Sequence, residues 1–243
     1  MSSSTMSSSL HKPLVYIISA PSGSGKSTLV NEILKSVSDL EFSISYTTRT
    51  PRGSEANGRQ YFFISRPEFE KMIREDQFLE HAEFDGNYYG TARRFLVDAE
   101  KNGRDLLLDI DVQGAAQIQG KISGATSIFI LPPDRGTLEE RLRKRGEDRK
   151  EVIQRRLIAA KREIEKYERY TYILVNDRLE DSIDMLRNIV RGERLLRSGN
   201  TLSNEEHKIV AQAEFCRLKN MKERLQPILA SFKISVDAGC SSP

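Results

Sequence analysis

The sequence predicts an α/β protein built on a mostly parallel β-sheet with helices on both of its faces. Short apolar, β-branched runs of the kind found in buried parallel strands occupy residues 14–18, 106–111, 126–131 and 171–175. Segments with apolar residues at helical spacing separate these runs. The first run leads directly into a Gly-rich turn and then into a helical pattern, which indicates the first βα unit.

The most informative stretch lies between this first strand and the first helix. It reads Ala20-Pro21-Ser22-Gly23-Ser24-Gly25-Lys26-Ser27-Thr28. In a turn of this kind, glycines let backbone N–H groups approach an anion closely, and the positive end of the following helix faces it. Lys26 is then placed to reach the β- and γ-phosphates of a nucleotide, and the Ser27 hydroxyl to ligate Mg²⁺. We therefore expect a nucleotide-binding P-loop with Mg²⁺ as cofactor.

One position departs from the general P-loop pattern. Ala20 stands where the first Gly is expected, which requires only that residue 20 avoid a positive φ. The alternative interpretation is a Gly/Ser turn with an incidental lysine. The strand before the turn and the helix after it favour the nucleotide site.

Composition limits the classes of function. The 243 residues are 38% hydrophobic and 30% charged, and the net charge of +3 gives no indication of nucleic-acid binding. Cys216 and Cys240 have no metal-ligand spacing and indicate a reducing compartment. No apolar run has the length of a transmembrane helix, and the Ser-rich residues 1–9 lack the features of a secretory signal. We expect a cytoplasmic protein without a membrane partner.

Residues 43–92 read as a small mixed α+β insertion after the first βα unit. Strands are predicted over residues 42–48 and 61–64, joined by a polar loop with Pro and Gly. Ser65 and Glu68 form a capping box that begins a short helix, and residues 78–91 predict a hairpin.

The α/β pattern then resumes. A helix from about Arg93 ends at Gly103, and three more strands follow. Ligands of parallel sheets bind at the carboxyl ends of the strands. The polar residues expected to gather there are Lys26, Asp109, Asp111 and Asn176.

Arginines are dense between residues 138 and 162, where Gly146 separates two helical patterns. A solvated, salt-bridged surface is the ordinary interpretation of such a charge run. Beside a P-loop, the segment also reads as a mobile lid that closes over transferring phosphates, which we favour.

The C-terminal part is helical in pattern. One helix is predicted over residues 179–196 and another over residues 203–229, which begins with a capping box at Ser203. The apolar residues of the second helix either dock on the core or pair with another subunit in a homo-oligomer, and the sequence leaves both open. The predicted divisions are a disordered tail (1–12), P-loop core (13–42), insertion (43–92), core (93–138), lid (139–160), core (161–198) and C-terminal helical extension (199–243).

The insertion carries side chains suited to a second, acceptor substrate. Arg49 and Arg52, with the hydroxyls of Tyr61 and Tyr89, suit a monophosphate through charge-assisted hydrogen bonds. A carboxylate pairs naturally with guanine N1–H and N2–H₂, and a hydroxyl donates to O6. Adenine lacks that donor pair, so it would leave a buried carboxylate unpaired. The candidates for reading the base are Ser45, Glu80, Thr91 and Asp109.

These segments resemble the guanylate kinase family over about residues 14–195. The matching motifs are Pro21-Ser22-Gly23-Ser24-Gly25-Lys26-Ser27-Thr28, Ser45-Tyr46-Thr47-Thr48-Arg49-Thr50-Pro51-Arg52, Glu55-Ala56-Asn57-Gly58-Arg59-Gln60-Tyr61, Gly86-Asn87-Tyr88-Tyr89-Gly90-Thr91, Leu108-Asp109-Ile110-Asp111-Val112-Gln113-Gly114 and Val175-Asn176-Asp177. The T-T-R-x-P-R and G-N-Y-Y-G segments are specific to that family. The resemblance implies a P-loop core with a GMP-binding insertion and a helical lid.

The resemblance also implies roles for individual positions. Ligands of the GMP phosphate are Arg49, Arg52, Tyr61 and Tyr89, and the guanine-reading set is Ser45, Glu80, Thr91 and Asp109. The ATP site is residues 20–28 with Asn176 against adenine, and Ser27 contacts Mg²⁺. The positions implied to be catalytic are Lys26, Arg49, Arg141, Arg145 and Arg156. Ala20 occurs in bacterial members, and Arg149 stands where many of them have Ser.

The implied activity is transfer of the γ-phosphoryl group of ATP to GMP, and we expect dGMP to be accepted as well. The acceptor is already an anion, so positioning and electrostatic stabilisation suffice without a strong general base. Two alternatives are kept. Guanylate-kinase-like domains also serve as non-catalytic protein-interaction modules, although those typically lack an intact P-loop. Another nucleoside monophosphate kinase is the second alternative, which the guanine-reading set disfavours.

Overall fold

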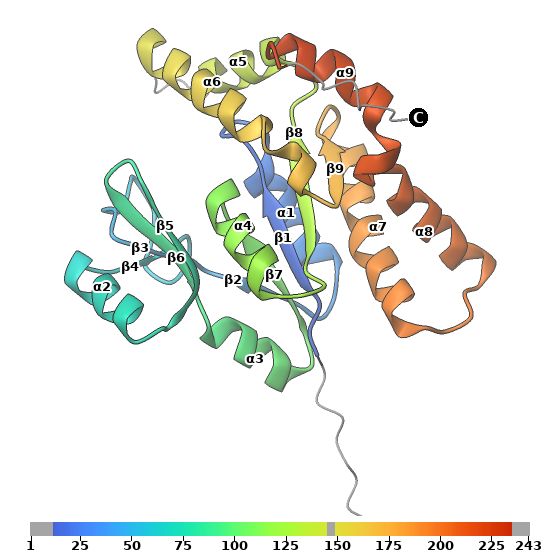
Figure 1. The fold of residues 1–243 in the computed structure, drawn as a ribbon, viewed down its shortest axis with the longest axis horizontal. Helices are drawn as coiled ribbons and strands as arrows, with labels where there is room; N and C mark the ends of the chain where they lie inside the picture. The colour runs from blue at the N-terminus through green and yellow to red at the C-terminus, as the bar shows by residue number, and fades with distance from the viewer. Residues whose placement is uncertain (1–11, 145–148, 235–243) are drawn as a thin grey trace, which may run out of the picture.

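The core of the protein is a parallel β-sheet, as the sequence predicts. The computed structural model describes residues 12–144 and 149–234. In this part of the chain the core sheet has the strand order β2 (Leu40–Ser43), β7 (Asp105–Asp109), β1 (Val15–Ser19), β8 (Thr126–Leu131) and β9 (Tyr172–Val175) (Figure 1). Every neighbouring pair is parallel. The expectations for residues 1–11 and for Arg145, Gly146 and Cys240 lie outside the described residues.

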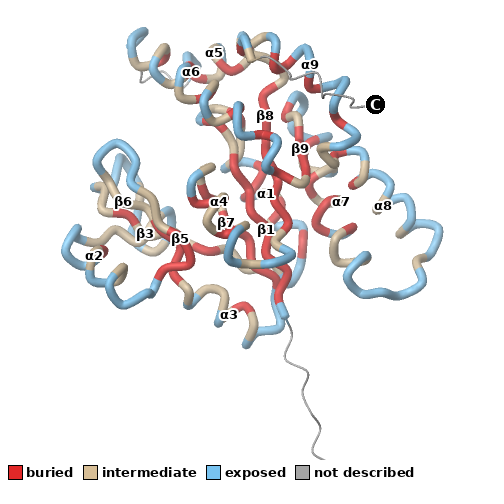
Figure 2. Tube along the Cα trace, in the orientation of Figure 1, coloured by how far each residue is buried: buried red, intermediate tan, exposed pale blue. Residues whose placement is uncertain are grey.

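Successive side chains of the core strands enter separate hydrophobic clusters on the two faces of the sheet. In β1, Ile17 belongs to one cluster and Ile18 to the other, and Leu108 and Leu107 of β7 divide in the same way. This division follows from the pleat, which turns alternate side chains to opposite faces. Strands β1, β7, β8 and β9 are buried along almost their whole length (Figure 2), so both faces need helices to cover them.

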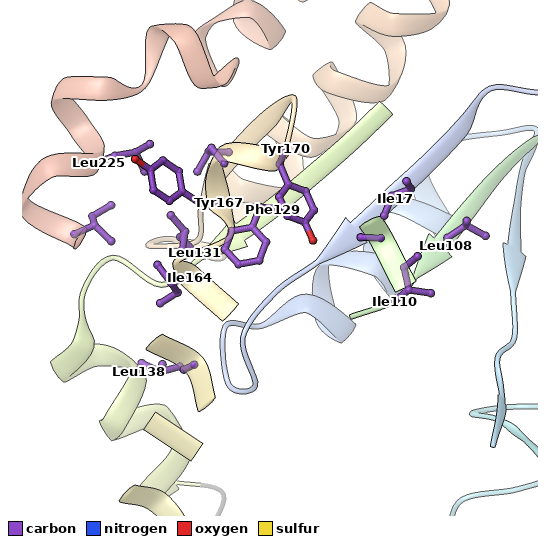
Figure 3. Close-up of a cluster of buried hydrophobic side chains, with 14 of the residues drawn as sticks. Ile17, Leu108, Ile110, Phe129, Leu131, Leu138, Ile164, Tyr167, Tyr170 and Leu225 are labelled. Carbon is purple, nitrogen blue, oxygen red and sulfur yellow. The ribbon is translucent and has the colours of Figure 1, made fainter. Parts of the chain in front are cut away.

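Helices cover each face. One cluster receives α1 (Lys26–Ser36), α7 (Leu179–Ser198) and α8 (Asn204–Phe215). The other receives α3 (Arg94–Asn102), α4 (Val112–Lys121), α5 (Arg135–Lys144), α6 (Lys150–Ile164) and α9 (Lys222–Ser231). Figure 3 shows this second cluster running from Ile17 in the sheet through Leu138 of α5 and Ile164 of α6 to Leu225 of α9. Short 3₁₀ helices are η1 (Tyr167–Arg169) and η2 (Leu218–Asn220).

The segment between β2 and β7 forms a second, smaller sheet. Its described strands stand in the order β4 (Phe62–Phe63), β3 (Tyr46–Thr47), β6 (Asn87–Ala92) and β5 (Phe78–Phe84). The predicted hairpin is confirmed as the antiparallel pair β5–β6. The side of this sheet away from the core is covered by α2 (Arg66–Arg74), whose Phe69 ring stacks on the Phe78 ring with centroids 4.4 Å apart (Figure 1). The predicted capping box at Ser65 is also present.

The strand predicted over residues 42–48 is wrong as a single element. β2 ends at Ser43 in the core sheet, and β3 begins at Tyr46 in the second sheet. Residues 44–45 therefore carry the chain from one sheet to the other. The β-forming residues continue across this point, so the pattern holds no signal for the change.

The helix predicted over residues 203–229 is also wrong as one element, although its capping box at Ser203 is confirmed. α8 ends at Phe215, and α9 begins at Lys222. Between them the backbone pairs with the outer edge of β9: Ile173 N donates to Cys216 O (2.8 Å), and Leu218 N donates to Thr171 O (3.0 Å). The extension thus covers an edge that would otherwise expose unpaired backbone groups.

The apolar residues of the extension have different surroundings. Leu225 is buried in the core, and α8 packs along α7, where Gly192 lies close to Ala213. Phe215 is 51% exposed. Pairing with another subunit through this extension stays a prediction. Among the described helices, none is both long enough and apolar enough to cross a membrane.

Candidate active site

The Gly-rich turn after β1 has the backbone of a phosphate-binding loop. Gly23 and Gly25 have φ of 94° and 87°, a region open to glycine at little cost, and α1 begins directly after Gly25. Ala20 does not have a positive φ, which is what its departure from the general pattern requires. Ser27 lies exposed in the first turn of α1, where the N–H groups of a helix start favour anions.

Asn176, which directly follows β9, fixes this loop from two strands away in the core sheet. Its Nδ2 donates to the carbonyl oxygen of Ser24 (2.7 Å), and the side chain is buried. A Cβ placed on Gly25 would overlap that same Nδ2. Gly25 is therefore needed for its backbone conformation and also for the space that Asn176 occupies. Whether Asn176 also contacts adenine stays a prediction.

We expect Gly25→Ala to destabilise the fold more than a matched change elsewhere. Gly124 has a similar φ of 83°, but a Cβ there meets nothing within 4 Å. Gly124→Ala should therefore lose only the cost of the left-handed conformation, about 1 kcal/mol. Gly25→Ala should lose about 1–3 kcal/mol more, the usual cost of overpacking. Urea unfolding measures both, and equal losses would contradict the role of Asn176.

Lys26 of the loop pairs with Asp109 at the end of the adjacent strand β7. Burial by itself lowers the pKa of Lys26, but the attraction of Asp109 and its hydrogen bond outweigh burial and raise that pKa above its usual value. Burial and the nearby Asp109 also raise the pKa of the Tyr61 hydroxyl. The insertion thus brings a tyrosine within electrostatic reach of the P-loop lysine.

Tyr61 also belongs to a cluster of aromatic and charged side chains in the insertion. The guanidinium of Arg49 lies over the Tyr61 ring, 5.4 Å from its centroid, and the rings of Tyr61 and Tyr89 meet edge to face at 6.0 Å. Arg49 is held by Glu55, whose Oε1 accepts from Nη2 at 2.9 Å. Sequence reasoning did not single out Glu55, although it lies within one of the matching motifs. Arg52 is exposed on the same loop, and Glu55 Oε2 accepts from its backbone N–H.

Glu80 and Thr91 lie together in the same sheet, two residues along β6 from Tyr89. They face each other across β5 and β6, and Thr91 Oγ1 donates to Glu80 Oε1 at 2.7 Å. Both side chains are buried. Burial raises the pKa of Glu80 to about 7, although the Thr91 hydrogen bond opposes this and nearby Asp111 adds to it. A buried carboxylate of this kind needs donors from a ligand to hold its charge.

Tyr89 and Thr91 share one face of β6, because side chains two apart in a strand point the same way. Tyr88, which directly precedes Tyr89, packs on the opposite face against Phe69 of α2. The arginine–tyrosine cluster and the carboxylate–hydroxyl pair therefore lie along the same face of one small sheet. Ser45 directly precedes β3 in this sheet, and its backbone carbonyl accepts from Phe62 N (2.9 Å).

The arginines expected to be catalytic on the lid are placed differently from one another. Arg141 of α5 donates from Nη2 to the carbonyl oxygen of Asn176 (3.0 Å), which ties α5 to the residue that supports the Gly-rich loop. Its Nη1 is buried and has no hydrogen-bond partner within the described residues. Arg156 lies on α6 and is partly buried. Arg145 is outside the described residues.

Glu163 of α6 is a further carboxylate near the P-loop, and sequence reasoning missed it. Burial raises its pKa to about 7; Lys26 lowers that pKa and Asp111 raises it. Glu163 stands among many charged residues of one helix, so the sequence offers no signal that separates it from a solvated side chain.

The donor set near the loop suits Mg²⁺ that arrives with phosphates. The Ser27 hydroxyl and the Asp109 carboxylate are oxygen ligands of the kind that this cation prefers. Among the described residues no group of three or more His, Cys, Asp or Glu could hold a metal. A Mg²⁺ ion bound here would need further oxygen ligands, which the phosphates of a nucleotide can supply.

Known proteins are similar to this chain in sequence and in structure. The guanylate kinase family model matches residues 12–193. The chain is 54% identical over 226 residues to a guanylate kinase of Koribacter versatilis, covering 92% of this chain and 97% of that one. It is 49% identical over 183 residues to a guanylate kinase of Escherichia coli K12, covering 74% and 88%. The crystal structure of guanylate kinase from Anaplasma phagocytophilum superposes with a TM-score of 0.62 at 33% identity, covering 75% and 87%. The chain belongs to the guanylate kinase family.

Proposed function

We propose that the protein transfers the γ-phosphoryl group of ATP to GMP, giving ADP and GDP, and that it accepts dGMP as well. The observation that carries this proposal is that one face of the insertion sheet carries two groups of side chains, each suited to a different part of a nucleotide. Arg49, Tyr61 and Tyr89 form a cluster suited to a monophosphate, and Glu80 with Thr91 forms a buried pair suited to a base with two N–H donors. The family matches over residues 12–193 support the same activity.

In this proposal the P-loop and Lys26 hold the phosphates of ATP, and Ser27 with Asp109 supplies oxygen ligands to Mg²⁺. When bound, Mg²⁺ neutralises charge on the transferring phosphates. Arg49 and the tyrosines orient the GMP phosphate toward the γ-phosphorus, and the lid arginines add positive charge on closure. The GMP phosphate is itself the nucleophile, so the side chains need only position it and exclude water.

Arg141 and Glu55 have supporting roles in this mechanism. Glu55 holds the Arg49 guanidinium through a hydrogen bond at 2.9 Å, which also raises the pKa of Arg49. Arg141 connects α5 to the P-loop support through the carbonyl oxygen of Asn176, while its second nitrogen is left for a ligand. The proposed acceptor site and the P-loop are thus both held by contacts made before substrates bind.

The binding of GMP should depend on pH through Glu80. Its pKa is raised to about 7, and only the ionised carboxylate offers acceptors to both guanine donors. KM for GMP should therefore fall as pH rises through about 7, by up to about tenfold per unit below that value. The GMP phosphate also titrates, near pH 6. In Glu80→Gln the GMP phosphate still titrates but residue 80 does not. The difference between the pH profiles of KM for GMP in the unaltered protein and in Glu80→Gln therefore reports the titration of Glu80. Identical profiles would contradict the assignment.

The proposed activity is tested by ADP formation from ATP and Mg²⁺ with GMP, AMP, UMP or no acceptor in parallel. Activity with GMP alone supports both the reaction and the base-reading site. Turnover without an acceptor would indicate an NTPase. Binding of GMP without turnover would favour a protein-interaction module of the same fold.

We propose the cytoplasm as the site of this reaction, because cysteine usage favours a reducing compartment and the substrates are soluble nucleotides. We also propose that the C-terminal extension mediates association with a second copy of this chain. A match covering 92% of this chain reaches beyond residue 198, so the Koribacter versatilis guanylate kinase shares at least part of that extension.

A further inference from the structure

Strand β5 lies at the edge of the insertion sheet, and a helix of the core covers its free backbone. The edge is the side of β5 away from β6. α4 lies against it (Figure 1), and the Gln117 side chain bonds to both backbone groups of His81. Its Oε1 accepts from His81 N (3.3 Å), and its Nε2 donates to His81 O (2.7 Å). One amide thus replaces the pairing that a neighbouring strand would give.

Two more residues of the same helix face extend this contact. Lys121, four residues after Gln117, donates from Nζ to the carbonyl oxygen of Leu79 at 2.7 Å. Gly114, three residues before Gln117, lies against the side chain of Glu80. Residues three and four apart share a helix face, so one face of α4 contacts three successive residues of β5.

Gly114 makes room for the Glu80 carboxylate. A Cβ on Gly114 would lie 2.5 Å from Glu80 Oε2 and 2.9 Å from Glu80 Cδ. Gly114 has no positive φ, so its backbone would accept alanine, which favours helices over glycine by about 1 kcal/mol. Close packing, and not conformation, is what glycine provides here. With Thr91 bonded to Oε1, the carboxylate is confined at both oxygens.

We propose that the Gly114, Gln117 and Lys121 face of α4 is a specificity-determining element that positions Glu80 to read guanine. This inference rests on the proposed role of Glu80. Gly114 and Gln117 are positioning residues, since they contact the side chain and the backbone beside the carboxylate. The alternative is that this face only docks the insertion on the core, in which case its loss would weaken the fold without changing base selection.

The test compares identical substitutions within α4. Gly120 lies on the same helix, and a Cβ there meets nothing within 4 Å. Gly114→Ala should raise KM for GMP at least about tenfold and reduce the preference for GMP over AMP, because the carboxylate is displaced. KM for ATP should not change. Gly120→Ala should keep the kinetics of the unaltered protein and gain thermal stability.

A second pair of variants, a test and its control, keeps the inference testable if Gly114→Ala does not fold. Gln117→Met removes both hydrogen bonds to His81 at similar volume. Gln119→Met is its control, since Gln119 Nε2 bonds instead to the carbonyl oxygen of Arg169 (2.7 Å). Gln117→Met should raise KM for GMP and lower the preference for GMP over AMP, whereas Gln119→Met should change neither.

Measuring Glu80→Gln in parallel separates the two levels of the inference. Should Glu80→Gln leave base preference intact, the proposed role of Glu80 is wrong and this inference is wrong with it. Should Glu80→Gln reduce base preference while Gly114→Ala and Gln117→Met behave like their controls, the positioning role alone is overturned. Equal rises of KM for GMP and ATP, or lower thermal stability with unchanged base preference, also overturn it in favour of simple docking.

Discussion

Lys26→Met is expected to lower kcat by about three orders of magnitude while KM for GMP changes little. Lys26 is the P-loop cation, and the charge that it supplies matters most when the γ-phosphoryl group is between donor and acceptor. Removing a preorganised charge of this kind costs on the order of 10²–10³ or more in rate. Its present partner is Asp109, so the lysine is oriented before substrates bind. Steady-state rates at saturating ATP and GMP measure the effect.

Lys35→Met is the matched control for this change. Lys35 lies in the last turn of the same helix, where its side chain is 70% exposed and pairs only locally with Glu32. Exposed pairs of this kind contribute little, so the control should keep full activity. Lys26→Met also leaves Asp109 without its cation, so a thermal melt is needed to show that the variant is folded. A folded Lys26→Met protein within tenfold of normal kcat would mean that the loop is not catalytic.

The main architecture is predictable because it follows from local patterns. Strands β1, β7, β8 and β9 are short, largely apolar on both faces and followed by a polar residue or turn, and two helices begin at recognisable capping boxes at Ser65 and Ser203. The change of sheet at residues 44–45 is not predictable in this way. It is decided by which partner strand lies alongside, a long-range pairing that leaves no trace in local alternation.

In the candidate site, too, residues within local motifs are predictable from the sequence, whereas residues that depend on three-dimensional contacts are not. Lys26 stands in a motif whose chemistry depends on local spacing, and it was found from the sequence. Gln117 and Glu163 lie beside residues far away in the sequence that only the fold brings near, whereas Glu55 contacts Arg49 six residues before it in the same loop. All three are residue types common on any solvated surface. Gly114 belongs to a matching motif, but its packing against Glu80 appears only in three dimensions. Motifs therefore predict which groups react, whereas the groups that hold them in place need the structure.

Glu80→Gln is expected to reduce the preference for GMP over AMP by about two orders of magnitude or more. The carboxylate offers two acceptor oxygens to guanine N1–H and N2–H₂, whereas the amide presents one acceptor and one donor. Sites that depend on such buried hydrogen bonds reject a mismatched partner strongly, on the order of 10²–10⁴ in kcat/KM. The loss should appear in kcat/KM for GMP, with kcat/KM for AMP unchanged or raised.

The control for this change is Glu83→Gln, on the same strand. Glu83 is 48% exposed and lies 3.7 Å from Arg66, outside the proposed base site, so its variant should keep the full preference.

Folding is not expected to suffer in Glu80→Gln. Folding raises the pKa of Glu80 from 4.5 to about 7, so the folded protein binds this proton more tightly than the unfolded chain does. As pH rises from 4.5 to about 7, ionisation of Glu80 therefore lowers the free energy of unfolding. The amide carries no charge to bury, and Glu80→Gln should therefore be at least as stable as the unaltered protein at about pH 8. A stable Glu80→Gln protein that still prefers GMP as strongly as before would show that the guanine is read elsewhere.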